Sequence, residues 1–398
     1  MDMSQITARL ETEIWDTREI APVEVASSDP SFERYAVMRH ENAVQLIPLA
    51  SRRISAASVV RWTDGMSPLD LGKRGVGWLA LLAGLGPVLA GSELAIKTRG
   101  AADSPSLNDH LASAVGLERT VVSVLLGSER PNQKPMVRVL DPAGRTIAFA
   151  KVGWNDLTTR LVTNEASFLE TMRPLAGSRL LIPALLDHST WRNRAIAVTS
   201  PLMGRLRPRR SRPPSPAVYE SILALGARHS GPWRSSAFRA HLADGLEVVV
   251  ERERLASIIG LLDDALDSAN ISVGRWHGDW TPWNTLTMGD RVIAWDWERT
   301  MEGVPIGFDA IHYLFQPRFS AAPSDHIAPL LASVDEADPV LAALGIGRKQ
   351  RWALAALYAA GLYVRFGMPP HDQFAVAAAG LATNAATALI APFRHRSG

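Results

Sequence analysis

The sequence contains no cysteine among its 398 residues, which excludes disulfide bridges and metal sites built from thiolates. It also lacks a strong charge of either sign. The formal net charge is +2, and so slight an excess gives no argument for binding nucleic acid. Residues 1–13 contain no apolar run of the kind found in signal peptides. We therefore expect a cytoplasmic protein that does not act on nucleic acid.

An uncharged run long enough to suggest a membrane span extends from Gly75 to Ser92, which is eighteen residues. Pro87 would break a helix about two-thirds of the way along this run. Several glycines in the same run weaken a long helix further. We predict a buried helix of about eight to ten residues here, and an element that skims a membrane is the lesser alternative.

The sequence does have the composition of an ordinary soluble globular protein, with 47% hydrophobic and 21% charged residues. A chain of this length can form two or three lobes with sizeable cores. Function must therefore be sought in local motifs, because the composition is not biased toward any special class.

The residues from 273 to 298 contain the most informative pattern. Thr285–Met288 and Arg291–Trp295 are typical of two short strands, and they are joined by Gly289-Asp290, a turn in which glycine accepts a positive φ. Such a hairpin brings together the residues at its two open ends, Asn284 and Asp296. An amide oxygen and a carboxylate that face the same space can hold Mg²⁺, which prefers oxygen ligands.

Asp279 lies five positions before Asn284 and is left to orient and deprotonate a hydroxyl group. An Asp that accepts the substrate proton, followed by an Asn and a later Asp that hold metal, is the layout of phosphoryl transfer. The pattern therefore indicates Asp279, Asn284 and Asp296 as catalytic residues, with Asn284 and Asp296 as the metal ligands. A plain solvated turn and hairpin, with His277 in the core, is the structural alternative.

This stretch resembles the aminoglycoside phosphotransferase and choline kinase branch of the protein-kinase-like fold. In that branch the loop reads His-Gly-Asp-x-x-x-x-Asn, as in residues 277–284 here, and the metal-binding Asp lies in Asp-Trp/Phe-Glu, as in residues 296–298. The resemblance implies an α+β, two-lobed fold with an antiparallel sheet N-lobe and a mainly helical C-lobe. It covers about 120–398. We expect an N-terminal extension of unknown role at 1–118, the N-lobe with its hinge at 119–204, and the C-lobe with the catalytic loop at 205–398.

The sequence from 120 to 172 fits an N-lobe. Thr120–Leu126, Met136–Leu140 and Thr146–Val152 are typical strands, and a helix is expected from about Leu161 to Met172. By resemblance, Lys151 near the end of the third strand grips the nucleotide phosphates, and Glu165 on the helix holds Lys151. Glu170 is the rival partner, and a solvated strand lysine is the structural alternative.

The phosphate loop departs from the G-x-G-x-x-G pattern, because only Gly127 and Ser128 stand where that pattern would be. The backbone amides and the Ser128 hydroxyl can still cap phosphates. The segment from Val198 to Gly204 resembles the hinge, where we expect Thr199 and Pro201 to contact a purine ring.

Two further segments bear on the substrate. Arg205–Arg212 is rich in Arg and Pro, which is typical of a solvated loop, but it could also recruit an acidic substrate or peptide. Trp280 and Trp283 could line an acceptor pocket. Polycationic aminoglycosides would need an acidic acceptor lobe, and residues 299–398 contain seven Asp and Glu against eight Lys and Arg. Asp309 is expected to brace the active-site floor, to cap its helix, or both.

These observations predict an ATP- and Mg²⁺-dependent phosphotransferase that transfers the γ-phosphoryl group to a hydroxyl of a small molecule, such as a sugar, an amino-alcohol or a natural product. A Ser/Thr peptide or protein kinase that docks its substrate on the Arg-rich segment is the first alternative. A pseudokinase-type binding scaffold is the second. The intact Asp279, Asn284, Asp296 and Lys151 speak against the scaffold.

Overall fold

The computed structural model describes residues 2–40, 43–59, 79–84, 92–101, 103–172, 179–202, 213–321, 327–367 and 378–385. The chain divides into two compact units. The first consists of Met1–Arg173 with Ile182–Arg207, and the second of Pro174–Leu181 with Pro208–Gly398.

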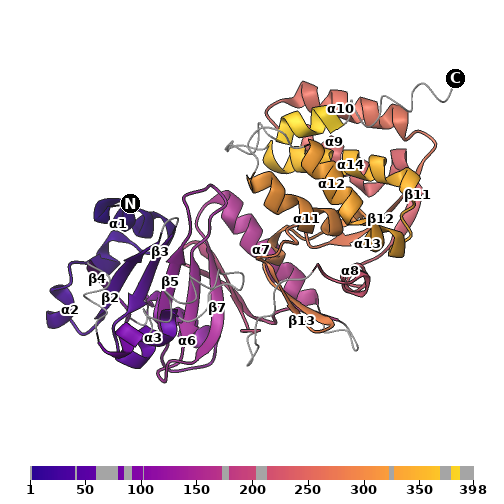
Figure 1. Ribbon diagram of the computed structural model, residues 1–398. Coiled ribbons are helices and arrows are strands. Elements are labelled where there is room, and N and C mark those ends of the chain that lie inside the picture. Colours follow the sequence, from indigo (N-terminus) through magenta and orange to yellow (C-terminus); the bar gives the residue numbers. More distant parts are fainter. Residues whose placement is uncertain are drawn as a thin grey trace. The chain divides into compact units, whose positions relative to one another are not determined.

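In the first unit, nine strands among the described residues form one sheet in the order β1-β4-β2-β3-β5-β6-β7-β10-β9, and all neighbours are antiparallel (Figure 1). The strands are β1 (Ile20–Ala21), β2 (Phe32–Arg39), β3 (Val44–Pro48), β4 (Glu93–Lys97), β5 (Val121–Leu126), β6 (Met136–Leu140), β7 (Thr146–Gly153), β9 (Leu185–Trp191) and β10 (Arg194–Thr199). The predicted strands at 120–126, 136–140 and 146–152 are confirmed to within one residue at each end.

One face of the sheet carries the main core of this unit. Two helices pack there, α1 (Met3–Glu13) and α6 (Leu107–Ala114), because their apolar positions recur at helical spacing. Alternate strand residues point to the same face. Buried members of this core include Ile6, Leu10, Leu107, Leu111, Val137, Val139, Ala150 and Val152.

The opposite face is covered by α3 (Arg52–Val59) and α7 (Asp156–Thr171), while α2 (Val25–Ser28) is a short surface turn. Helix α7 begins five residues earlier than predicted. The reason is its cap: the Asn155 side chain accepts the Thr158 N–H at 2.8 Å, so the helix can begin at the next residue, Asp156. On its buried side, Val162 and Ala166 contact the alanines of β10.

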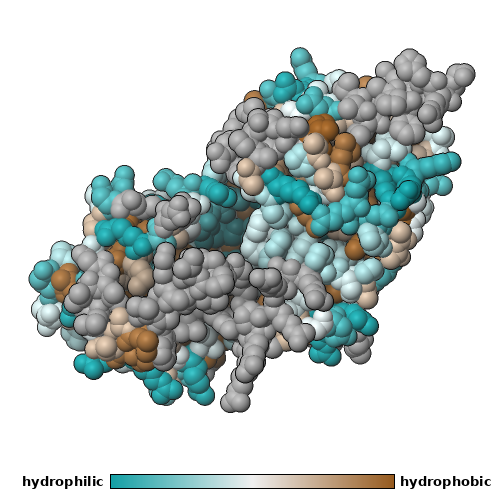
Figure 2. Space-filling view, in the orientation of Figure 1, coloured by the Kyte–Doolittle hydropathy of each residue, from teal (hydrophilic) through white to brown (hydrophobic). Residues whose placement is uncertain are grey.

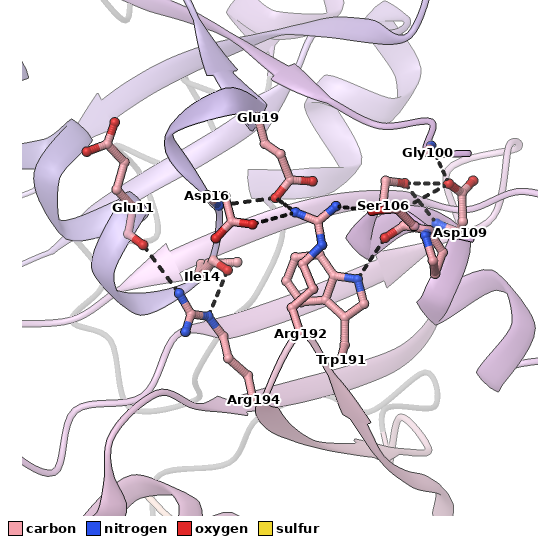
Figure 3. Close-up of polar contacts among 12 residues, drawn as sticks. Glu11, Ile14, Asp16, Glu19, Gly100, Ser106, Asp109, Trp191, Arg192 and Arg194 are labelled. Atoms are coloured by element: carbon pink, nitrogen blue, oxygen red, sulfur yellow. Dashed lines mark hydrogen bonds and ion pairs between the residues drawn. The ribbon is translucent and has the colours of Figure 1, made fainter. Parts of the chain in front are cut away.

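The N-terminal segment is fastened to the hairpin of β9 and β10 (Figure 3). Arg192 and Asn193 both have positive φ, 47° and 63°, as a tight two-residue hairpin turn requires. From this turn the Arg192 guanidinium pairs with Asp16 at 3.1 Å and with Glu19. Arg194 donates to the Ile14 carbonyl at 2.9 Å. Residues far apart in sequence are thus held in one unit.

Residues 1–118, the predicted N-terminal extension of unknown role, contribute β1 to β4 to the same sheet as β5 to β7. The junction is the pairing of β3 with β5, in which Val44 lies opposite Leu126. Part of the Gly75–Ser92 run lies outside the described residues. Its described part includes a helical turn at 79–82 whose Leu81 is 1% exposed.

On the face drawn in Figure 2, hydrophilic residues predominate and hydrophobic ones form small separate patches. Among the described residues, no helix is both long enough and apolar enough to cross a membrane.

The second unit is mainly helical (Figure 1). Its helices are α8 (Pro216–Leu223), α9 (Ala237–Gly245), α10 (Arg252–Ala265), α11 (Phe308–Ala321), α12 (Ile327–Glu336), α13 (Asp338–Ala343) and α14 (Arg351–Phe366). Its short strands are β8 (Leu180–Leu181), β11 (His229–Pro232), β12 (Asn270–Trp276), β13 (Thr285–Met288), β14 (Arg291–Ala294) and β15 (Met301–Pro305). In the described part they form two small sheets, β11-β12-β15 and β13-β14-β8. The predicted α+β class, with an antiparallel N-terminal sheet and a helical C-terminal part, is confirmed.

Candidate active site

The predicted hairpin is present. Strands β13 and β14 pair with Thr285 opposite Ala294, and Gly289 in the turn has a φ of 65°. At the open end, the Trp295 N–H donates to the Asn284 carbonyl at 3.2 Å. Asn284 is therefore held beside Trp295, the residue that precedes Asp296, while the approach of the Asn284 and Asp296 side chains to each other stays a prediction.

Asp279 and Asn284 are in direct contact. The Asn284 amide nitrogen donates to Asp279 Oδ2 at 2.8 Å and to the Asp279 carbonyl at 3.0 Å. Since the nitrogen end of the amide is used in this way, the Asn284 Oδ1 is the end left to bind a cation. Asn284 is 6% exposed, so its orientation is fixed by packing as well as by hydrogen bonds.

Two residues that the sequence analysis did not identify also contact Asp279. The His312 Nε2 lies 3.2 Å from Asp279 Oδ1, and the Arg365 Nη2 lies 3.0 Å from the same oxygen. His312 is three residues after Asp309 on α11, so helical spacing from that motif could have revealed it. Arg365 lies in the Ala/Leu-rich helix α14, where no sequence pattern indicates its partner.

The surroundings of Asp279 keep it ionised. Burial by itself would raise the pKa of this carboxyl group, but the charge of Arg365 and the hydrogen bond from His312 outweigh burial and hold the pKa well below its usual range. Asp279 is therefore a hydrogen-bond acceptor at every physiological pH. Its side chain remains 21% exposed, so a ligand can reach it.

His277 ties the catalytic loop to the segment that carries Asp296. Its Nδ1 accepts the Asp279 N–H at 3.1 Å, and its Nε2 donates to the Trp295 carbonyl at 3.1 Å. These two contacts assign the neutral tautomer with the proton on Nε2. Burial lowers the pKa of His277 to about 4, against the opposing effects of the nearby Asp279 and Asp296 charges and of the hydrogen bond to Trp295. The residue acts as a neutral structural bridge and does not act as an acid or base near neutral pH.

The loop backbone between these residues is constrained at Gly278. Its φ is 86°, and a Cβ atom at this position would lie 2.1 Å from the Arg299 carbonyl oxygen. Only glycine fits there. Asp309, in the first turn of α11, accepts the N–H groups of His277 and Gly278 at 2.8 and 3.3 Å. Asp309 thus braces the loop, one of its two expected roles, and burial raises its pKa to about 7.

Asp296 has an unusual backbone conformation, with φ 71° and ψ 52°. A left-handed conformation is uncommon for a residue other than glycine, and such strain is found preferentially at functional sites. A carboxylate, as in Asp296, and an amide oxygen, as in Asn284, are oxygen ligands of the kind that Mg²⁺ prefers. The residues present therefore fit the metal predicted from the sequence.

In the first unit, Lys151 and Glu165 form an ion pair. The Lys151 Nζ lies 2.6 Å from Glu165 Oε2, and their side chains are 13% and 3% exposed. Glu170, the rival partner, is exposed. The structure therefore brings together the two residues that the resemblance paired, while their role toward a nucleotide stays a prediction.

The remaining predicted nucleotide contacts also lie in the first unit. Gly127 and Ser128 follow β5 and are half-buried, and the Gly127 carbonyl accepts from Arg9 at 3.0 Å. Thr199 ends β10, directly opposite Phe149 of β7, and Pro201 follows it. The segment Arg205–Arg212, expected to be a solvated loop with the docking of an acidic substrate or peptide as the alternative, lies outside the described residues.

One expectation about the acceptor pocket is wrong. Trp280 is fully buried, with its ring 5.4 Å from His277 and 6.0 Å from Tyr219, so it belongs to the core beneath the loop and does not line a pocket. Trp283, in contrast, is 40% exposed. The difference arises because the loop turns between the two positions, which single-sequence spacing does not reveal.

No protein-family profile matches the sequence, and no curated protein matches it. Solved structures of several small-molecule kinases are similar in structure. A thermostable mutant of aminoglycoside phosphotransferase APH(4)-Ia in complex with ADP and hygromycin B has 13% sequence identity and a TM-score of 0.45, over 72% of this chain and 98% of that one.

For a fructosamine-3-kinase-like protein of Thermobifida fusca the identity is 15% and the TM-score 0.44, over 72% of this chain and 99% of that one. For amicoumacin kinase hAmiN with AMP-PNP and Ca²⁺ the identity is 12% and the TM-score 0.41, over 67% of this chain and 88% of that one.

Proposed function

We propose that this protein is a phosphotransferase that uses a nucleoside triphosphate, with ATP and Mg²⁺ as the expected pair, to phosphorylate a hydroxyl group of a small molecule. The observation that carries the proposal is the arrangement of Asp279, Asn284 and the strained Asp296. The Asn284 nitrogen is bound to Asp279, its oxygen is left for a cation, and the hairpin holds it beside the residue before Asp296.

In this proposal Asp279 accepts the hydrogen bond of the acceptor hydroxyl and directs its oxygen toward the γ-phosphorus. A carboxylate whose pKa is lowered by its neighbours suits this role, because phosphoryl transfer has a loose transition state that needs orientation more than a strong base. The metal, when bound by Asp296 and Asn284, would neutralise charge on the phosphate oxygens. Lys151, positioned by Glu165, would contact the nucleotide phosphates.

The test begins with nucleotide binding, measured as a thermal shift with ATP, with and without Mg²⁺. The shift should depend on Mg²⁺ in the wild type and be lost in Asp296→Ala, because that change removes the charged metal ligand. Asp290→Ala is the matched control. It lies in the turn of the same hairpin, its side chain is 69% exposed, and its loss should leave the shift unchanged.

The acceptor class is tested separately, by incubating the protein and labelled ATP with metabolite extracts and with Ser/Thr-containing peptide mixtures. Label in a small molecule supports the proposal, and label in peptides alone replaces it with a protein kinase. Binding of ATP without transfer to any acceptor or to water would instead indicate a scaffold.

A further inference from the structure

Helix α14 reaches the catalytic loop at two points on one of its faces. Tyr358 and Arg365 are seven residues apart, which is two turns, so their side chains project from the same side. The Arg365 Nη1 donates to the Gly278 carbonyl at 2.6 Å while its Nη2 contacts Asp279 Oδ1 at 3.0 Å. The Tyr358 hydroxyl lies 2.7 Å from His312 Nδ1.

These contacts converge on a single carboxylate oxygen. His312 is fully buried, and burial lowers its pKa, so it is neutral. A neutral His312 can accept the Tyr358 O–H at Nδ1 and donate its Nε2–H to Asp279 Oδ1. Both arms from α14, the direct one through Arg365 and the indirect one through Tyr358 and His312, thus end at Oδ1.

The other oxygen is left with capacity. A carboxylate offers about four acceptor positions, two on each oxygen. Among the described residues, Oδ1 receives two donors, His312 and Arg365, whereas Oδ2 receives only the Asn284 amide. The position that remains for a ligand's hydroxyl is therefore on Oδ2, the oxygen that also contacts the proposed metal ligand Asn284.

We propose that Arg365 is a positioning residue, supported by Tyr358 through His312, which clamps Asp279 Oδ1 to helix α14 and so presents Oδ2 to the acceptor hydroxyl. This inference rests on the proposed function and extends it to a helix that the motif does not include. Arg365 contacts both the Gly278 carbonyl and the Asp279 carboxylate. These two contacts fix the loop backbone and the rotation of the Asp279 side chain, which a single contact would not do.

The helix is a rigid support for this purpose. Most of α14 is enclosed, and the two residues next to Tyr358, Leu357 and Ala359, are 1% and 0% exposed. The Arg365 side chain is itself only 14% exposed. Phosphoryl transfer is sensitive to small displacements of the reacting groups, so the residues that position them must themselves be held in place by packing.

The experiment measures MgATP turnover by the full chain with water as the acceptor, by release of inorganic phosphate, together with ATP binding by calorimetry. Arg365→Gln should lower kcat about 10- to 100-fold and leave ATP affinity unchanged. Arg365→Lys keeps the charge but can make only one of the two contacts, so it should recover part of the loss. Arg318→Gln, which removes a partly exposed arginine on α11, should have no effect.

A double-mutant cycle separates positioning from a general structural role. If Arg365 acts through Asp279, adding Arg365→Gln to Asp279→Asn should change kcat by less than about twofold. Tyr358→Phe removes only a hydroxyl group and should give a smaller loss with the same pattern, which keeps the inference testable if Arg365→Gln does not fold.

Losses that multiply in the double mutant, or an active Arg365→Gln protein with wild-type kcat, would overturn the clamp while leaving the phosphotransferase intact. A wild-type protein that turns over no MgATP, with water or with any acceptor, would overturn the proposed function and the clamp together.

Discussion

Arginines stand at the centre of a polar network in each unit, but they serve different ends. In the first unit Arg192 pairs with Glu19, whose side chain is only 3% exposed, and the pair joins segments that are distant in sequence. In the second unit Arg365 pairs with Asp279, whose side chain stays 21% exposed. The same chemistry therefore fastens a fold where the carboxylate is enclosed, and in the proposed function it positions a carboxylate that a ligand can reach.

The protonation of the two carboxylates reflects this difference. Burial raises the pKa of Glu19, and its hydrogen bond and nearby charges do not offset the rise. Burial acts in the same direction on Asp279, but Arg365 and His312 overcome it and hold the pKa well below its usual range. An enclosed carboxylate can tolerate partial neutralisation, whereas an acceptor for a substrate hydroxyl must keep its charge.

The largest effect is expected from Asp279→Asn. This change keeps the shape of the side chain and one acceptor oxygen but removes the charge and the ability to take a proton. We expect kcat to fall about 10²- to 10⁴-fold, with ATP affinity and stability nearly unchanged. Single-turnover phosphoryl transfer and an ATP titration on both proteins measure this. Loss of ATP binding in step with rate would make Asp279 a structural or metal-shell residue instead.

Arg192→Ala should lower stability and leave kcat unchanged, which is the opposite of the result expected for Asp279→Asn. It leaves Glu19 buried without its cation, so the free energy of unfolding should fall by roughly 2–3 kcal/mol, below the 3–5 kcal/mol of a fully buried pair because Arg192 is 23% exposed. Urea denaturation measures the loss, and kcat at a temperature where the variant is folded should be that of the wild type. A variant with normal stability and reduced kcat would contradict the structural role of Arg192 and the distinction between Arg192 and Arg365.

The pH dependence of stability tests the neutral bridge at His277. Because its pKa falls from 6.5 in the unfolded chain to about 4 in the fold, the unfolded state binds more protons between these values, and stability is lost as the pH decreases through this window. From pH 7 to pH 5 this residue should cost about 2 kcal/mol, from 1.36 kcal/mol for each unit of pKa. His277→Gln, compared with the wild type by denaturation at both values, should remove that part of the dependence. An equal pH dependence in both proteins would contradict the neutral assignment.

The smallest effect on kinetics is expected from the ion pair of Lys151 and Glu165, in which Lys151 is predicted to contact the nucleotide phosphates. Lys151→Met deletes the charge but keeps much of the side-chain volume. The KM for ATP should rise, or kcat fall, by about tenfold, which corresponds to about 1.4 kcal/mol. Steady-state kinetics measure it, with Lys134→Met, another lysine of the same unit, as the control. Normal kinetics in Lys151→Met would show that Lys151, like Arg192, has only a structural role.

Local patterns in the sequence were sufficient where the physics is local. Short apolar runs bounded by loop and turn residues predicted strands β5 to β7, and a two-residue turn with glycine predicted the hairpin of β13 and β14. In the structure the hairpin holds Asn284 beside Trp295, because antiparallel pairing fixes which residues are opposite. The spacing of Lys151 and Glu165 was informative for a similar reason, since α7 follows β7 directly and packs beside it.

Contacts between distant segments were not predictable in this way. Residues 1–118 gave no motif, yet β3 pairs with β5 in the sheet. The role of these residues becomes visible only in the structure, where they contribute to the buried face of that sheet. Trp280 is next to Asp279 in sequence but points into the core. The direction of a loop side chain depends on the backbone conformation of the loop, which positive φ at Gly278 sets here.

The sequence by itself determined which groups the proposed site can use: an Asp, an Asn and a second Asp at spacings that a turn and a hairpin can bring together. The tertiary structure alone decided how that chemistry is held, because Arg365 and His312 reach Asp279 from helices 86 and 33 residues away. Residues so far apart share no local periodicity, and they meet only because burial of the apolar faces of α11 and α14 places both helices against the same loop.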